Sequence, residues 1–223
     1  MKRGELLGET RTPDGGSLTL TRHDREYVIM ADGRSLMSSR MHGSEQALAT
    51  LALRRIRAAE PAVLVGGLGM GFTLRATLDL LVPSATVVVA ELVPAVVEWN
   101  RGPLAALADE PLRDTRVRME IGDVADTLEA SRNRFDAVLL DVDNGPDAFT
   151  SSTNARLYTD QGLATAREAL KPGGVLAVWS AWEQRRFEQR LRHAGFSVTV
   201  ERVRGRLEKG GPMHTIFLAT RGA

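Results

Sequence analysis

Beyond Pro61 the chain alternates short apolar runs with segments whose apolar residues recur at helical spacing. The runs are rich in valine, leucine and alanine, which is typical of strands buried on both faces of a parallel sheet. Alternating strands and helices predict an α/β fold with a Rossmann-like, doubly wound, mostly parallel sheet. The predicted strands are 63–65, 86–90, 117–121, 137–140 and 175–179, and the predicted helices are 72–81, 94–100, 124–130, 160–170 and 183–194.

Two further apolar runs, 197–203 and 215–218, follow without a helix between them. The linker 204–212 is too short for a parallel crossover, which needs about a dozen residues or more. We therefore expect a C-terminal antiparallel pair that completes a sheet of about seven strands.

The first part of the chain has a different pattern, with short strand-like runs separated by turns that contain aspartate and glycine. These runs predict a small β-rich N-terminal appendage over residues 1–43. From Ser44 the apolar positions return at helical spacing, so we expect a linking helix with Ser44 as its N-cap. The main domain then covers residues 44–223. The strand-like runs of the appendage are 18–21, 27–30 and 36–41.

Composition narrows the classes of function. The 223 residues are 43% hydrophobic and 26% charged, as in an ordinary globular protein. The 29 basic and 28 acidic residues nearly cancel, so we expect neither a nucleic acid nor a membrane partner. Cysteine is absent and the four histidines are scattered, so no metal site is expected. The polar start of the chain does not look like a signal peptide, which favours a cytoplasmic protein.

A glycine-rich turn, Gly66-Gly67-Leu68-Gly69-Met70-Gly71, follows the first strand of the main domain. Such a turn before a helix lets a cofactor approach the backbone, although it also serves as a plain strand-to-helix connection. Gly67, Gly69 and Gly71 are spaced G-x-G-x-G, and Phe72 stands where a dinucleotide-binding fingerprint has its third glycine. This spacing disfavours a dehydrogenase.

Acidic residues follow the next three strands of the predicted sheet. Glu91 can accept hydrogen bonds from both hydroxyls of a ribose, or lie as a solvated strand end. Asp123 can accept from an adenine amino group, or cap the next helix. Asp141 and Asp143 open a long loop and are candidates for catalysis, or for turn formation. Because the carboxyl ends of parallel strands meet at one edge, we expect these groups to converge there.

These residues resemble the polyamine aminopropyltransferases, or spermidine synthases, within the class I S-adenosylmethionine-dependent methyltransferase fold. The resemblance runs from about residue 63 to residue 180, and its best segments are VLVGGLGMG, VVVAELVPAVVEWNR, IGDVADTL, FDAVLLDVDNGP and LYTDQGLATAREALKPGGVLAVWS. It implies a transferase that uses decarboxylated S-adenosylmethionine and a small amine. It further implies that the glycine turn lines the nucleoside, Glu91 binds ribose, Asp123 binds adenine and Asp141 holds and deprotonates the amine. Family members are often dimers, so the resemblance also implies a homodimer.

The sequence departs from the family pattern at three places that would meet a cationic amine. Gly69 replaces an aspartate of the glycine turn, Asn144 replaces an aspartate after the catalytic one, and Gly43-Ser44 replace a Tyr-Gln pair before Glu45. Without the turn aspartate, the carboxylate of intact S-adenosylmethionine is no longer repelled. Two alternatives therefore stay open: a methyltransferase that uses S-adenosylmethionine on an unknown acceptor, and a non-catalytic nucleoside-binding protein.

Either transfer is an attack on a carbon bonded to sulfonium, so the protein must align the reactants and supply an unprotonated nucleophile. We expect Asp141 to accept the proton or to orient the amine, with Asp143 adding negative potential. Trp179 and Trp182 are further candidates to line the pocket, the first more readily explained as core.

Overall fold

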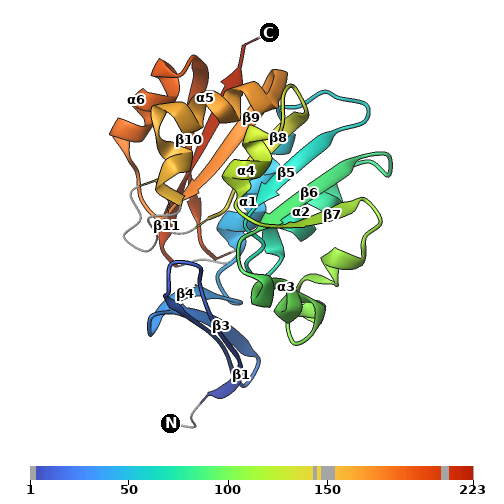
Figure 1. Cartoon of the computed structure of the whole chain (residues 1–223), viewed down its shortest axis with the longest axis vertical. Helices are drawn as coiled ribbons and strands as arrows, with labels where there is room; N and C mark the ends of the chain where they lie inside the picture. The colour runs from blue at the N-terminus through green and yellow to red at the C-terminus, as the bar shows by residue number, and fades with distance from the viewer. Residues whose placement is uncertain (1–3, 143–144, 147–153, 207–210, 223) are drawn as a thin grey trace.

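The computed structural model describes residues 4–142, 145–146, 154–206 and 211–222. Two sheets make up the architecture (Figure 1). The first has four antiparallel strands in chain order and lies at one end of the molecule. Its strands are β1 Glu5–Arg11, β2 Ser17–His23, β3 Glu26–Ala31 and β4 Arg34–Ser38.

The second sheet has seven strands in the order β10-β11-β9-β8-β5-β6-β7. Five of them are parallel, while β11 pairs antiparallel with both β9 and β10. The α/β fold with a C-terminal antiparallel pair is thus confirmed. The strands are β5 Ala62–Gly66, β6 Thr86–Glu91, β7 Val117–Ile121, β8 Phe135–Leu140, β9 Leu170–Ser180, β10 Phe196–Arg204 and β11 Met213–Arg221.

Helices cover both faces of the large sheet, and alternate strand residues supply each interface. On one face Val63, Val87 and Leu139 pack with apolar residues of α1, α2 and α3, whereas Leu64 and Val88 pack with α4, α5 and α6 on the other. This explains why the strands read as unbroken apolar runs. The helices are α1 Gly43–Leu53, α2 Phe72–Leu80, α3 Pro94–Arg101, α4 Val124–Glu129, α5 Asp160–Ala169 and α6 Arg185–His193; short 3-10 turns span Ala105–Ala108, Pro111–Arg113 and Asn154–Tyr158.

Three local expectations from the sequence were wrong. The polar strand β1 was missed, and it is fixed by pairing with β2 and by Gly8, where any Cβ would meet the Trp99 indole. Ser44 does not cap α1, because His42 holds that position and Ser44 lies buried within the helix. Strand β9 starts at Leu170 rather than at 175, directly after α5.

The small sheet stands at the carboxyl ends of the parallel strands (Figure 1). Its buried Leu18, Leu20 and Ile29 belong to the same apolar cluster as α1 and α3. Strand order reverses between β5 and β8, the place where open α/β sheets bind ligands. No helix in the described part of the chain is long and apolar enough to cross a membrane. The division into domains 1–43 and 44–223 stays a prediction.

Candidate functional site

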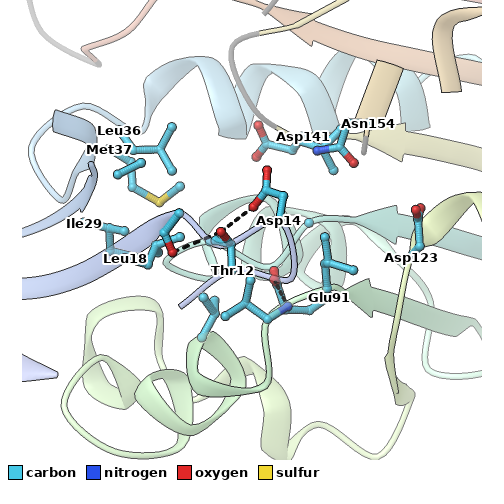
Figure 2. Close-up of a pocket in the computed structure, with 18 of the residues that line it drawn as sticks. Thr12, Asp14, Leu18, Ile29, Leu36, Met37, Glu91, Asp123, Asp141 and Asn154 are labelled. Carbon is cyan, nitrogen blue, oxygen red and sulfur yellow. Dashed lines mark hydrogen bonds between the residues drawn. The ribbon is translucent and has the colours of Figure 1, made fainter. Parts of the chain in front are cut away.

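A cavity of about 270 Å³ lies where the small sheet meets the carboxyl ends of β5, β6, β7 and β8 (Figure 2). We call it the donor cavity. Four predicted groups line it together: the glycine turn through Gly67 and Gly69, then Glu91, Asp123 and Asp141. The small sheet and its turns supply much of the remaining wall, with Thr12, Asp14, Gly16, Ser17, Leu18, Ile29, Ala31, Asp32, Leu36 and Met37. The main domain completes the wall with Ala90, Leu92, Val93, Val96, Gly122, Val124, Val142 and Asn154.

The glycine turn presents backbone to the donor cavity for steric reasons. Gly67 has φ +89°, and a Cβ there would lie 2.4 Å from the carbonyl oxygen of Asp141. Gly71 adopts φ +84° at the N-cap of α2. Residues other than glycine rarely adopt this conformation, and the Asp141 main chain leaves no room for a side chain at Gly67, so the turn needs glycine and lines the cavity as a cradle of bare backbone above β5. Such a cradle suits a nucleoside, which must approach the main chain closely.

Glu91 ends β6 with its side chain buried. Its Oε2 accepts from the Leu68 N–H and its Oε1 from the Val93 N–H, both at 2.9 Å. Burial raises the pKa of Glu91, and these backbone hydrogen bonds oppose the rise. Each carboxyl oxygen has a second lone pair, so the fixed group can still accept from ligand hydroxyls.

Asp123 lines the donor cavity and also caps α4. Its Oδ1 accepts from the Ala125 N–H at 2.8 Å, and its Oδ2 lies 2.8 Å from Nη2 of Arg156. Arg156 also pairs with Asp126 at 2.6 Å. The capping and lining interpretations of Asp123 therefore describe the same side chain. Sequence reasoning missed the arginine, which comes from a turn 33 residues further along the chain.

A second cavity of about 170 Å³ adjoins the first, and we call it the acceptor cavity. Both cavities share Leu36, Met37, Gly69 and Asp141 as lining residues. Asp141 thus lies between them. The other residues of the acceptor cavity are Ser38, Met41, Glu45, Leu68, Met70, Phe72, Thr73, Trp179, Ala181 and His214.

Two carboxyl groups face this second cavity. Asp141 accepts a 2.5 Å hydrogen bond from the Thr73 hydroxyl, and burial raises its pKa to about 6. Burial and the charge of Asp141 together raise the pKa of Glu45 to about 8. A cation placed between the two groups would favour their ionised forms. Trp179 lines the cavity rather than the apolar core alone, and it packs against His214 at 4.8 Å between ring centroids.

Gly69, where the family pattern has an aspartate, lies against Met37 of the small sheet. A Cβ at Gly69 would meet the Met37 sulfur at 3.2 Å, so the thioether occupies the space that a larger side chain needs. Asp14, in the β1–β2 turn, brings another carboxylate to the donor cavity. Figure 2 draws it reaching toward the side where Asp141 lies, and its Oδ1 accepts from the Thr12 hydroxyl at 2.5 Å.

Acidic side chains outnumber basic ones in the walls of the two cavities, although Arg156 pairs with Asp123 beside the donor cavity. Among the described lining residues there is no lysine or arginine, and His214 is the one basic side chain. The described residues hold no group of three or more metal-ligating side chains. The predicted Asp143 and its neighbour Asn144 lie outside the residues that the structure describes.

Comparison with solved structures identifies the fold that carries this site. Spermidine synthase from Thermotoga maritima superposes with a TM-score of 0.75 at 20% identity, over 98% of this chain and 73% of that one. A spermidine synthase in complex with the transition-state analogue AdoDATO gives the same score at 19% identity, with the same coverage. The chain therefore has the spermidine synthase fold, as the sequence resemblance implied.

Sequence comparison then gives the family. A family model described as S-adenosyl-L-methionine-dependent methyltransferase matches residues 89–210, more than half of the chain, and the chain belongs to that family. The polyamine aminopropyltransferase of Korarchaeum cryptofilum is 29% identical over 121 residues, which are 54% of this chain and 35% of that protein. The Nitrosomonas europaea protein of the same name is 34% identical over 92 residues, 41% of this chain and 27% of its own length. These matches span about a third of the relatives or less.

Proposed function

We propose that this protein transfers an aminopropyl group from decarboxylated S-adenosylmethionine to an amine. The observation that carries the proposal is the charge of the two adjoining cavities. Their described walls hold carboxyl groups and no lysine or arginine. Decarboxylated S-adenosylmethionine ends in an ammonium, which this field attracts, whereas the carboxylate of S-adenosylmethionine would be repelled.

The donor would lie along the carboxyl ends of β5, β6 and β7. The bare backbone at Gly67 would lie against the nucleoside, Glu91 would accept from the ribose hydroxyls, and Asp123 would accept from the adenine amino group; all three residues line the donor cavity, which supports this assignment. Asp14 stands in for the carboxylate that Gly69 lacks and attracts the donor ammonium. The donor thus contributes the leaving group, and the chain contributes its alignment.

The acceptor would occupy the second cavity, with its nitrogen beside Asp141. The amine lone pair forms the new nitrogen–carbon bond, while the carbon–sulfur bond breaks and its electron pair stays on sulfur as a neutral thioether. An ammonium cannot attack, so one proton must leave the acceptor first. Asp141 lines both cavities and has a raised pKa, which fits a group that orients the amine and accepts that proton.

Methyl transfer from S-adenosylmethionine is the second candidate function. The family description favours it, and so does Gly69, which removes one carboxylate from the donor side. The same cavity and the same sulfonium chemistry would serve either donor. The two functions differ in the product that the donor leaves behind.

One assay separates these functions. Incubation with each donor and a panel of amines is followed by chromatography of the nucleoside products. We expect methylthioadenosine from the decarboxylated donor, formed about a hundredfold more slowly when Asp141→Asn replaces the wild type. S-adenosylhomocysteine from the intact donor would favour methyl transfer instead. Tight donor binding with neither product would identify a non-catalytic nucleoside-binding protein.

A further inference from the structure

Four residues line both the donor cavity and the acceptor cavity, and they surround the place where the two cavities meet. We call this place the junction. Its residues are Leu36, Met37, Gly69 and Asp141. Leu36 and Met37 lie in β4, and Figure 2 shows them across the donor cavity from Asp141. The junction is therefore bounded by the small sheet on one side and by the main domain on the other.

Hydrogen bonds within the main domain fix the two residues that it contributes to the junction. The Gly69 carbonyl accepts from Nδ2 of Asn100 at 2.8 Å, and Asn100 is buried at the end of α3. The Asp141 carboxylate accepts from the Thr73 hydroxyl at 2.5 Å, and the Asp141 N–H donates to the Gly66 carbonyl at 2.9 Å. This side of the junction is consequently held in one position by the fold.

The opposite side of the junction depends on the side chain of Met37. A Cβ at Gly69 would lie 3.2 Å from the Met37 sulfur and 3.3 Å from its Cε. The end of the thioether thus packs directly over the glycine, and its position sets the width of the junction. Met37 is half-buried, and methionine is unbranched with three rotatable bonds. This side can therefore change its shape while the other side stays fixed.

We propose that Met37 is a specificity-determining residue that sets the size of the group transferred between the two cavities. The inference rests on the proposed function, because the transferred carbon must lie between the donor sulfur and the acceptor nitrogen. At that carbon the bond to sulfur breaks and the bond to nitrogen forms, and the electron pair of the broken bond stays on sulfur. Met37 exchanges no proton or electron in this step and acts by packing against the group.

The chemistry of the junction suits a short alkyl chain. The methylenes of an aminopropyl group are apolar and gain dispersion contacts with a thioether wall, while the facing carboxylate of Asp141 attracts nitrogen. A bulkier side chain at position 37 would leave room for a methyl group but not for a three-carbon chain. Charge in the cavities therefore selects one end of the donor, and the width of the junction adds a separate selection by size.

Binding of three probes tests this role without turnover. Methylthioadenosine reports on the donor cavity alone, and butylamine reports on the acceptor cavity alone. A linked probe reports on the junction: the sulfur of thioadenosine is bonded to the first carbon of an aminopropyl group, and that carbon carries an alkyl chain in place of butylamine. Calorimetry gives the dissociation constant of each probe for wild type and variants.

Met37→Phe should narrow the junction. We expect it to weaken the linked probe by about tenfold or more beyond its combined effect on the two separate probes, the range in which a pocket discriminates one or two methylenes. In turnover, kcat for aminopropyl transfer should fall by a similar factor with the donor KM little changed. Met37→Leu keeps the volume and should bind all three probes as wild type does.

Met37→Ala tests the opposite change and decides the question where Met37→Phe fails to fold. It should bind a linked probe with one added methyl on the transferred carbon about tenfold better, relative to the unbranched probe, than wild type does. Met41→Phe is the matched control, since Met41 lines the acceptor cavity but not the donor cavity. It should weaken butylamine and the linked probe by the same factor.

Two results would overturn the role of Met37. One is a linked probe that Met37→Phe weakens no more than it weakens the two separate probes, with no gain for the branched probe in Met37→Ala. The other is a linked probe that wild type binds no more tightly than methylthioadenosine.

The proposed function is judged separately, by the nucleoside products. Methylthioadenosine formation together with either of these results leaves the transfer standing and removes Met37 from it. The expected loss of linked-probe binding without product from either donor supports the junction and overturns the transfer.

Discussion

The donor and acceptor cavities share Asp141, Met37 and Gly69, yet they are built in different ways. On the donor side, the main chain forms important parts of the site. Backbone N–H groups hold the Glu91 carboxylate, and the glycine turn lines the cavity with bare backbone. On the acceptor side, side chains from α1, β9 and β11 surround Asp141. A backbone-built site is fixed by the fold, whereas a side-chain site changes with a few substitutions. Under the proposed function, we therefore expect a few substitutions to change the choice of acceptor more readily than the binding of the nucleoside.

The largest expected effect comes from replacing Asp141, which should distinguish catalysis at the acceptor cavity from binding at the donor cavity. Asp141→Asn keeps the shape but loses the proton acceptor, so we expect kcat to fall by about a hundredfold or more. Donor affinity, measured by calorimetry, should change far less, because the carboxyl ends of β5 and β6 are untouched.

Glu91→Gln is the matched variant on the donor side and should show the opposite pattern. It replaces one acceptor oxygen of a buried carboxylate with an amide, so we expect weaker donor binding and a smaller change in kcat at saturating donor. Equal losses of donor affinity in both variants would show that the cavities do not act separately.

The donor side could be predicted from the sequence better than the acceptor side. Glu91, Asp123 and Gly67 were predicted because each follows its own strand, and parallel strands end at one edge. The hydrogen bond between Ser44 and His214 was not predicted. It depends on β11 lying between β9 and β10 in the sheet and on His214 of β11 reaching α1. Strand β1 was missed because it is half exposed and carries few apolar residues. Local motifs can be recognised in the sequence, whereas contacts between distant segments become visible only in the folded structure.

Stability as a function of pH offers a sharper test of the acceptor side. The pKa of Glu45 rises from 4.5 to about 8 in the folded state. The folded protein therefore binds this proton more tightly, and the associated stability is complete below pH 4.5 and lost as the pH rises through 8. Asp141, with a pKa near 6, adds its contribution at lower pH. We expect the free energy of unfolding to fall from pH 6.5 to 8, by at most about 1.4 kcal/mol per pH unit for this one group.

Glu45→Gln should flatten that decline, because glutamine stays neutral throughout. Denaturant unfolding at several pH values measures it, with Glu60→Gln on the exposed surface as the control. Parallel curves for wild type and Glu45→Gln would contradict a protonated Glu45 in the free protein.

The smallest effect is expected from the turn of the small sheet. Asp14 is exposed, and an exposed charge pair contributes about 0.2–1 kcal/mol, so Asp14→Asn should weaken binding of the decarboxylated donor only a few-fold. Methylthioadenosine, which lacks the ammonium, should bind both forms alike. Asp24→Asn is the matched control, since it changes the β2–β3 turn of the same sheet and lines neither cavity. Added salt should shrink the difference between Asp14→Asn and wild type, because screening weakens exposed charges first. Equal affinities for the decarboxylated donor would leave Asp14 as a turn residue and assign the negative field to Asp141 and Glu91.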